Sequence, residues 1–191
     1  MEPQVPILVE SAKALARMLD FPSSCSDEAG NLLRLLALRV GVVRVGEIGT
    51  GCGVGAAWIA SGLRTEARLH TVELDADRAS AATGLFEGSS QVRVIHGDWH
   101  GLLRFGPFDL LFADVGSAKA LEPQVLVEAL TIGGTVLLDD FTPEELWTPE
   151  QRRQWSRGDP VRTFWLGHGA LVAAELQVSA TSSVILGVRS N

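Results

Sequence analysis

The chain opens with two stretches whose apolar residues recur at helical spacing. The first spans residues 6–20, and Phe21-Pro22 ends it because proline and the residue before it fit poorly into a helix. In the second, Ser26 stands as a helix-capping residue, acidic residues follow in the first turn, and leucines recur as far as Leu38. The pattern predicts two leading helices, the second of them amphipathic.

From residue 42 the pattern changes to short β-branched runs that alternate with helical stretches. Such alternation is typical of a parallel sheet covered by helices on both faces. The predicted strands span residues 42–48, 68–74, 91–97, 108–114 and 133–140. The helices expected between them span residues 55–63, 75–86 and 119–130.

The last part of the chain has a different pattern. Residues 148–156 and 159–167 each begin with a capping residue followed by a proline, which predicts two helices. Two apolar runs follow, "ALVAAELQVS" and "SSVILGVRS", joined by "ATS". Because this connection is too short for a helical crossover, the two runs are expected to pair as an antiparallel hairpin.

Composition favours one soluble globular domain over residues 1–191, with leading helices in residues 1–40 and a strand–helix core in residues 41–191. The net charge of −7 argues against a nucleic-acid partner, and no apolar run reaches the ~18–20 residues of a membrane span. The acidic start of the chain lacks the pattern of a secretory signal. Cys25 and Cys52 lack the spacing of a disulfide framework or zinc site, so a cytoplasmic protein is expected.

The stretch "GTGCGVG" places four glycines in seven positions directly after the first predicted strand. Glycine lets the backbone adopt positive φ and approach a ligand closely. The GxGxxG/A pattern of dinucleotide binders is met by Gly51, Gly53 and Ala56. The E/DxGxGxG pattern of nucleoside–amino-acid binders is met without gaps from Glu47 through Gly49 onward. Glu47 favours the second interpretation, because a carboxylate suits an ammonium group and repels a pyrophosphate.

With these residues the sequence resembles the class I S-adenosylmethionine-dependent methyltransferases. Glu73 ends the second strand, where the family has an acid for the ribose hydroxyls, and Asp98 follows the third, where the family has an aspartate for the adenine amino group. The resemblance covers roughly residues 26–191 and implies an α/β fold, a Rossmann-like doubly wound sheet of order 3-2-1-4-5-7-6 with strand 7 antiparallel. The cofactor-binding residues that it implies are Glu47, Gly49, Thr50, Gly51, Gly53, Glu73, Leu74, Asp98, Trp99 and Asp114.

Three further acids lie at the ends of the fourth and fifth predicted strands, at Asp114, Asp139 and Asp140. In the implied order these strands are neighbours, about 4.8 Å apart, so their carboxylates are expected to converge beside the methyl donor. Clustered carboxylates repel one another unless a cation neutralises them, and a hard divalent ion such as Mg²⁺ prefers such oxygens. These residues therefore predict a metal or acceptor site; a turn or capping role is the alternative for Asp140.

This group of residues is similar to that of the cation-dependent O-methyltransferases of the catechol and caffeoyl-CoA type. The resemblance implies Asp114 and Lys119 as the catalytic residues. There are two departures. The family ends its fifth strand with Asp-Asn, whereas this chain has Asp139-Asp140. The family's lysine lies three residues past the first metal aspartate, where this chain has Ser117, so Lys119 reaches the site only if the loop differs and is otherwise a solvated helix residue.

The sequence thus predicts an S-adenosylmethionine-dependent methyltransferase that acts on oxygen of a small, catechol-like acceptor, with a divalent cation as a candidate helper. Trp147, Trp155 and Trp165 lie where this fold often builds its acceptor wall, and Arg162 either binds an acidic acceptor or forms a surface salt bridge. Two rivals stay open: a non-catalytic S-adenosylmethionine-binding protein and a nicotinamide-dependent oxidoreductase. A homodimer is expected from the resemblance alone.

Overall fold

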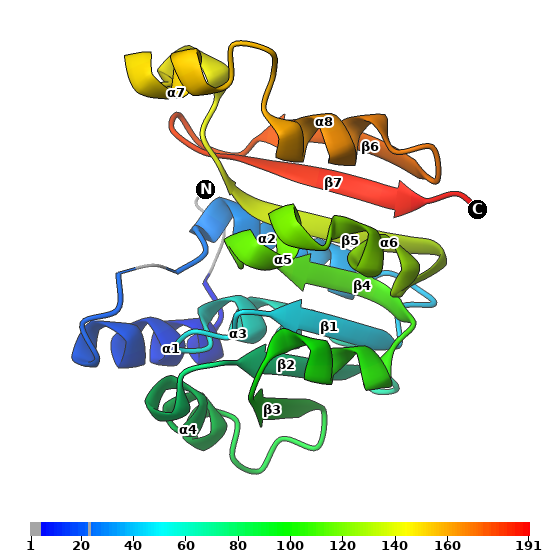
Figure 1. Cartoon of the computed structure of the whole chain (residues 1–191). Coiled ribbons are helices and arrows are strands. Elements are labelled where there is room, and N and C mark those ends of the chain that lie inside the picture. Colours follow the sequence, from blue (N-terminus) through cyan, green and yellow to red (C-terminus); the bar gives the residue numbers. More distant parts are fainter. Residues whose placement is uncertain (1–4, 23) are drawn as a thin grey trace.

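The computed structural model describes residues 5–22 and 24–191, and its centre is one seven-stranded sheet (Figure 1). The strand order is β3-β2-β1-β4-β5-β7-β6, which confirms the predicted Rossmann-like α/β fold. The strands are β1 (Arg44–Ile48), β2 (Arg68–Glu73), β3 (Val92–His96), β4 (Phe108–Ala113), β5 (Leu130–Phe141), β6 (Leu171–Gln177) and β7 (Ser183–Arg189).

The pairing of the strands agrees with the predicted connections. The strands from β1 to β5 pair in parallel with their neighbours, because helical segments return the chain to the same end of the sheet. The short connection after β6 produces the predicted hairpin, and β7 enters antiparallel between β5 and β6. Strand 7 is therefore antiparallel to the rest of the parallel sheet, as predicted.

Two apolar cores fill the space between the sheet and its helices. One core joins α1, α2 and α3 to the side chains of Val45, Leu69 and Leu110 on one face of the sheet. The other places Leu126 and Trp165, from the helices after β4 and β5, against the opposite face. The helical segments are α1 (Ile7–Met18), α2 (Asp27–Ala37), α3 (Val54–Ala60), α4 (Ala76–Leu85), η1 (Trp99–Phe105), α5 (Gly116–Leu121), α6 (Pro123–Glu128), η2 (Glu144–Leu146), α7 (Pro149–Gln154) and α8 (Pro160–Gly167).

The structure differs from the predicted elements in the following places, besides small shifts of element ends and the unpredicted 3-10 helix η2. The helix predicted over residues 119–130 is two helices, α5 and α6, because Pro123 starts a new helix after Glu122 leaves the helical conformation. Strand β5 begins three residues before the prediction, and Gly133 has a φ of +80° within it. The 3-10 helix η1 follows β3 where no helix was predicted. Residues 1–4 of the predicted leading segment lie outside the described residues.

The carboxyl ends of the parallel strands meet at one edge of the sheet, and the predicted site residues follow these ends. Glu47 lies near the end of β1, Glu73 ends β2, and Asp114 follows β4 directly. Within the described residues, none of the helices has the length and apolar character needed to cross a membrane.

Candidate functional site

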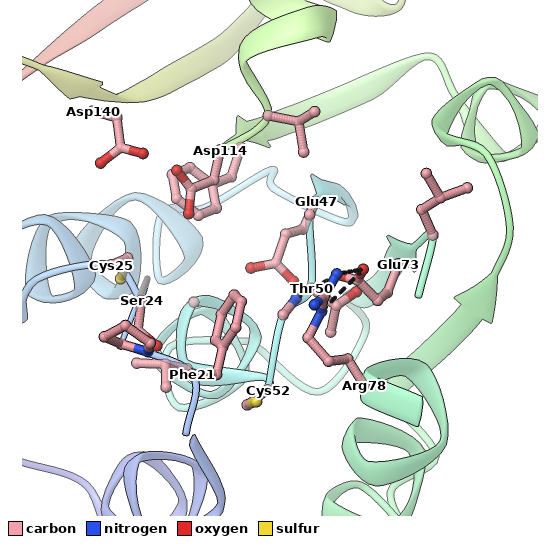
Figure 2. A pocket seen from close by; sticks show the side chains of 18 residues that line it. Phe21, Ser24, Cys25, Glu47, Thr50, Cys52, Glu73, Arg78, Asp114 and Asp140 are labelled. Atoms are coloured by element: carbon pink, nitrogen blue, oxygen red, sulfur yellow. Dashed lines mark hydrogen bonds and ion pairs between the residues drawn. The ribbon is translucent and has the colours of Figure 1, made fainter. Parts of the chain in front are cut away.

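Two neighbouring cavities lie at the predicted site. The first cavity has a volume of about 530 Å³ and lies at the carboxyl ends of β1, β2 and β4 (Figure 2). The loop between β1 and α3 borders it with Gly49, Thr50 and Gly51. The segment between α1 and α2 adds a second wall that includes Phe21 and Cys25. Small-molecule sites usually have volumes of ~300–1,000 Å³, so the cavity is large enough for a nucleoside with an amino-acid extension.

Two glycines make room at this cavity. Gly49 has a φ of +92°, and a Cβ atom there would lie 2.7 Å from Cγ2 of Val115. Gly55, in the first turn of α3, faces Glu47, and its Cβ would lie 2.4 Å from Oε1 of that carboxylate. A side chain at either position would therefore displace its neighbour.

Peptide N–H groups of the glycine loop are occupied within the protein. Those of Gly49 and Thr50 donate to the carbonyl of Val72 at 3.0 and 3.1 Å. That of Gly53 donates to the carbonyl of Thr50 at 2.8 Å. A pyrophosphate needs such groups to point toward the ligand. These bonds therefore disfavour the dinucleotide interpretation of the loop.

Glu47 is fully buried, with 0% of its surface exposed, and borders the first cavity. In the parallel pairing of β1 with β2, Glu47 lies opposite Thr71, whose hydroxyl donates to Oε2 of Glu47. The Thr50 hydroxyl contacts Thr71 in turn and acts as the donor there, because Thr71 has only one hydroxyl proton. Oε1 of Glu47 has no hydrogen-bond partner among the described residues. An unsatisfied, buried carboxylate oxygen suits a cationic ligand group.

Burial is the largest cause of the raised pKa of Glu47, which reaches about 8. The hydrogen bond from Thr71 opposes this shift, whereas the nearby carboxylates of Asp114 and Glu73 reinforce it. An ammonium group beside Glu47 would favour the ionised form and lower this pKa again.

Glu73 is buried and holds the glycine loop in place. Its Oε2 accepts the N–H of Gly51 at 2.8 Å, and its Oε1 accepts the N–H of Asp75 at 2.9 Å. Arg78 on α4 also donates to Oε1, at 3.0 Å through Nη2, and lies 5.0 Å from the centre of the Phe21 ring. The predicted ribose residue thus borders the cavity, with Arg78 as a partner that the sequence did not indicate.

A hollow of about 130 Å³ adjoins the first cavity, since Glu73 and Leu74 line both. Asp98 and Trp99, which follow β3, also line it. The side chain of Asp98 accepts the N–H of His100 at 2.9 Å and contacts the His100 ring. These contacts lower the pKa of Asp98 and raise the pKa of His100. The structure therefore gathers the predicted adenine-side residues in one place.

Asp114 and Asp140 lie next to each other at one side of the first cavity (Figure 2). Burial, followed by repulsion from Asp140, raises the pKa of Asp114 to about 8. Oδ1 of Asp114 has no hydrogen-bond partner among the described residues. Asp140 has a φ of +65°, at a point where the register of β5 against β7 shifts. Such an irregularity re-aims a side chain, and here Asp140 turns toward the cavity.

Asp139 does not join this pair. Only 4% of its surface is exposed, it borders neither this cavity nor the next, and its Oδ1 accepts the N–H of Asp140 at 2.9 Å. Across residues 5–22 and 24–191, no group of three histidine, cysteine, aspartate or glutamate side chains is arranged to hold a metal ion. The three residues predicted as metal ligands are therefore not gathered into one site: Asp114 and Asp140 border the cavity, and Asp139 does not.

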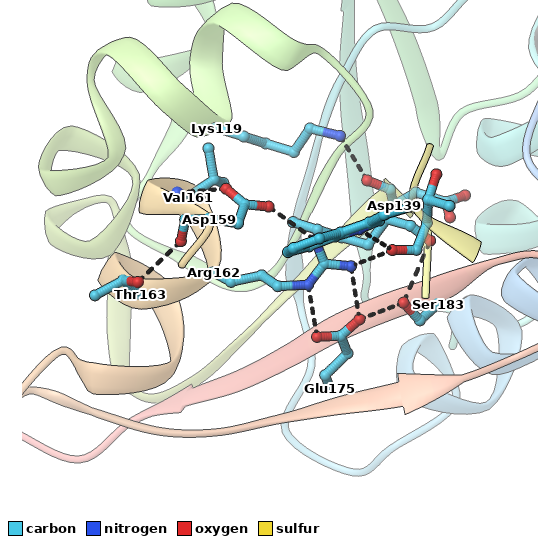
Figure 3. A network of polar contacts seen from close by, with 11 residues as sticks. Lys119, Asp139, Asp159, Val161, Arg162, Thr163, Glu175 and Ser183 are labelled. Atoms are coloured by element: carbon cyan, nitrogen blue, oxygen red, sulfur yellow. Dashed lines mark hydrogen bonds and ion pairs between the residues drawn. The ribbon is translucent and has the colours of Figure 1, made fainter. Parts of the chain in front are cut away.

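A second cavity, of about 370 Å³, lies beside the first, and Asp140 lines both. Its walls include Phe141, Trp155 and the side chain of Lys119. Lys119 is only 6% exposed, and its Nζ donates to the backbone carbonyl of Asp139 at 2.5 Å (Figure 3). The chain thus places a buried ammonium group beside the carboxylates.

The position of Lys119 follows from α5, which begins at Gly116 directly after the Asp114 loop. Residues two apart on a helix point about 200° away from each other. Ser117 accordingly lines the adenine-side hollow, whereas Lys119 faces the second cavity. The family's spacing of three residues therefore does not locate the lysine of this chain.

Arg162 is buried within a network that joins three segments of the chain (Figure 3). Its guanidinium donates to Asp159 at 2.8 Å, to both oxygens of Glu175 at 2.9 and 3.0 Å, and to the carbonyl of Thr142 at 2.6 Å. The predicted salt bridge of Arg162 is present, but it is buried and not at the surface. Four of the five N–H donors of Arg162 are already occupied, which leaves only one for an acidic acceptor.

The tryptophans of the last third have separate positions. Trp155 lines the second cavity, and Trp147 packs edge-on against it at 4.9 Å between ring centres. Trp165 is fully buried and donates from Nε1 to the carbonyl of Lys119 at 3.1 Å. Only Trp155 therefore borders the predicted acceptor side, while Trp165 fixes the backbone of the lysine.

The charged side chains around the first cavity indicate the sign of the charge that its ligand carries. Four carboxylates border it, from Glu47, Glu73, Asp114 and Asp140, against the single guanidinium of Arg78. A ligand with positive groups is favoured there by charge, and a pyrophosphate is not. The unsatisfied oxygens of Glu47 and Asp114 and the space kept by the glycines fit S-adenosylmethionine, which carries an ammonium and a sulfonium group.

Comparisons with known proteins agree with this site. Residues 47–141 match the family described as methyltransferase domain. A protein of Mycolicibacterium vanbaalenii with a provisional O-methyltransferase name is 30% identical over 138 residues. That match covers 66% of this chain and only 60% of the relative's own length.

Solved structures share the fold over nearly the whole chain. The O-methyltransferase TomG of Streptomyces achromogenes, in complex with S-adenosylmethionine, has a TM-score of 0.81 at 21% identity and covers 100% of this chain and 93% of its own. A protein of Staphylococcus aureus, provisionally described as a caffeoyl-CoA O-methyltransferase, has a TM-score of 0.73 at 16% identity and covers 95% and 91%.

The sheet order and the acid-lined cavity beside a glycine loop define the class I S-adenosylmethionine-dependent methyltransferases. The chain is similar to members of this family over residues 47–141 and shares their fold, as the sequence predicted.

Proposed function

We propose that this protein is an S-adenosylmethionine-dependent O-methyltransferase with a small, hydroxylated, catechol-like acceptor. The observation that carries the proposal is the meeting of two cavities at Asp140: one is acid-lined and fits the donor, and the other is partly aromatic and carries Lys119. The names of the relatives and the donor complex of TomG support the same activity.

The donor is held by groups on three strand ends. Glu47 and Asp114 face its ammonium and sulfonium charges, Glu73 takes a ribose hydroxyl, and Asp98 with Trp99 borders the adenine. Gly51, Asp75 and Arg78 already donate hydrogen bonds to Glu73. Glu73 therefore has fewer free lone pairs for a ligand than an unbonded carboxylate would have.

The acceptor occupies the second cavity in this proposal. Phe141 and Trp155 offer ring faces against which an aromatic acceptor packs. Its hydroxyl points toward Asp140, because that residue stands at the junction with the donor cavity. Because the two cavities share Asp140, an acceptor oxygen in one is placed beside a donor methyl group in the other. Such positioning is the main contribution of the protein to methyl transfer.

When bound, S-adenosylmethionine supplies an electrophilic methyl group on its sulfonium. Asp140 takes the proton of the acceptor hydroxyl as the acceptor oxygen forms its bond to the methyl carbon. The electron pair of the breaking carbon–sulfur bond stays with sulfur, so the carboxylates of Glu47 and Asp114 lose part of the positive charge that they faced. Lys119 donates to the acceptor oxygen while negative charge develops on it. No step is assigned to a divalent cation, because the predicted ligands do not converge.

Calorimetry with S-adenosylhomocysteine and with NAD tests the donor assignment. We expect S-adenosylhomocysteine to bind and NAD not to bind; tight binding of NAD alone would overturn the assignment. A panel of catechols and monophenols with labelled donor then tests transfer. The Asp140→Asn variant is expected to keep its affinity for S-adenosylhomocysteine within a few-fold and to lose about 100-fold in kcat, because general base catalysis contributes ~10²–10⁴-fold.

Failure of transfer to every hydroxylated acceptor would favour the rival in which the protein binds S-adenosylmethionine without catalysis. A homodimer and a location in the cytoplasm remain predictions, and gel filtration of the full chain tests the first of them.

A further inference from the structure

The three acids predicted from the sequence as metal ligands do not share one arrangement in this chain. The carboxylate of Asp139 accepts a backbone N–H at 2.9 Å and borders neither cavity. Asp114 and Asp140 lie next to each other and border the first cavity (Figure 2), whereas the described residues form no three-residue metal-binding group with Asp139. With Asp139 turned to a backbone N–H, only two of the three predicted ligands border the cavity, so a divalent ion there would take most of its oxygen ligands from water or from the acceptor.

A positive charge already stands at this place. Nζ of Lys119 lies 2.5 Å from the carbonyl of Asp139 and is buried. Trp165 fixes the backbone of this lysine through its carbonyl, at 3.1 Å. The ammonium is therefore held in position from two sides, and one of its three protons is already donated.

We propose that the ammonium of Lys119, and not a divalent cation, is the positive group that binds and polarises the acceptor oxygen. The proposal rests on the proposed function, since it names the group at the same acceptor site. Two of the three N–H donors of Lys119 have no partner among the described residues, and the side chain lines the second cavity.

The replacement of a metal ion by one ammonium group determines which class of acceptor is expected. A metal centre favours an acceptor with two adjacent oxygens, because both can bind one ion. A single ammonium at the end of the cavity addresses one oxygen. We therefore expect this protein to methylate a monohydroxylated aromatic ring at least as well as the corresponding vicinal diol, in the presence of chelator.

Metal binding is tested directly with Mn²⁺ and the full chain loaded with S-adenosylhomocysteine, followed by electron paramagnetic resonance of free Mn²⁺. The expected result is no stoichiometric binding up to millimolar Mn²⁺. One tightly bound Mn²⁺ per chain that the Asp114→Asn variant releases would overturn the proposal.

The lysine is tested with Lys119→Met and Lys119→Arg, and Lys13→Met is the matched control because Lys13 and Lys119 are the only lysines of the chain. Lys13 lies on α1 in a partly exposed ion pair with Asp27. We expect Lys119→Met to lower kcat about 100-fold, which is the usual cost of losing one donor to a developing oxyanion. S-adenosylhomocysteine affinity should change less than about three-fold.

Lys119→Arg keeps the charge in a larger group and provides the check on folding. We expect it to retain the native circular dichroism spectrum and an activity between those of the native protein and Lys119→Met. Full activity of a folded Lys119→Met, or equal loss in Lys13→Met, would contradict the proposal.

The proposed function and the proposed role of Lys119 are contradicted by different results. If chelator abolishes transfer to every acceptor and Mn²⁺ or Mg²⁺ restores it, the proposed function stands and the inference about Lys119 is wrong. If no acceptor is methylated with or without metal, the proposed function itself fails.

Discussion

Glu47 shows how one buried carboxylate selects a ligand. It lies against the glycine loop with one oxygen satisfied by Thr71 and the other without a partner. Ionisation of such a group is unfavourable until a cation arrives, which is why its pKa reaches about 8 in the free protein. Ligand binding and proton release are therefore linked at this residue.

The first prediction concerns that linkage. Because the ammonium of S-adenosylhomocysteine requires ionised Glu47, its affinity should rise between pH 6 and pH 8, by at most about ten-fold per pH unit for each proton released. Titration calorimetry of the native protein and of Glu47→Gln measures the two slopes, and the variant should have the smaller one. Adenosine is the control ligand, since it lacks the ammonium; an equal slope for adenosine would contradict the mechanism.

The second prediction concerns the glycine that faces Glu47. Gly55→Ala should lower the free energy of unfolding by about 1–3 kcal/mol and weaken S-adenosylhomocysteine binding, because the new Cβ would meet Oε1 of Glu47 at 2.4 Å. Gly84→Ala in α4 is the matched control, because a Cβ there meets nothing within 4 Å. Chemical denaturation and calorimetry measure both effects. A variant at Gly55 as stable as the Gly84 variant would show that the carboxylate moves freely.

At the scale of elements, Arg162 joins helix α8, strand β6 and the end of β5. It bonds to Asp159 before α8, to Glu175 on β6 and to the carbonyl of Thr142 after β5. It also stacks between Phe141 and Trp147, at 5.0 and 5.4 Å from their ring centres. One side chain thereby fixes the wall of the second cavity.

The third prediction follows from this position. Arg162→Met should lower the free energy of unfolding by about 3 kcal/mol, because two carboxylates lose their buried partner. Arg64→Met is the control, since its pair with Glu66 is exposed and such pairs contribute less than about 1 kcal/mol. Urea denaturation followed by fluorescence measures both. Equal losses in the two variants would mean that burial of the network contributes little.

The elements that the sequence predicts well are those with a clear period. The five parallel strands are short apolar runs between helical stretches. The observed strand order is the one that the resemblance implied. The break at Pro123 was missed because apolar residues continue on both sides of it. The positive φ of Asp140 was missed as well, since it depends on the shifted register between β5 and β7.

The site was predictable where it depends on strand ends and unpredictable where it depends on side-chain direction. Glu47, Glu73 and Asp114 border the cavity because parallel strands end together. The direction of Asp139 away from the cavity depends on the bulge beside it, which the sequence pattern does not reveal. Arg78 gave no signal, because an arginine on a helix is most often a solvated residue.

At the scale of the whole molecule, the acid-lined cavity makes stability depend on pH. The pKa values of Glu47 and Asp114 are raised from 4.5 and 3.8 to about 8. The folded protein therefore binds protons more tightly than the unfolded chain, and this contribution to stability is complete below about pH 4 and is lost as pH rises toward 8.

The fourth prediction is the resulting pH profile. The free energy of unfolding of the ligand-free protein should fall from pH 5 to pH 8, and Glu47→Gln should fall less steeply over the same range. Denaturation at four pH values measures the difference between the two proteins, which cancels the contributions of His100 and other titrating groups. A steeper fall in the variant would contradict the assignment of the raised pKa to Glu47.

The antiparallel strand β7 lies between β5 and β6, although it is the last strand to be synthesised. During synthesis on the ribosome, β5 therefore cannot pair with β7 until residues 183–189 have emerged. Most of the donor site comes from β1, β2 and β4, with Asp140 of β5 as the exception. The network around Glu175 also requires Ser183 on β7, whose hydroxyl contacts that carboxylate. The wall that receives the acceptor is thus expected to mature after the pocket for the donor, so that nascent chains acquire ligand binding before they acquire turnover.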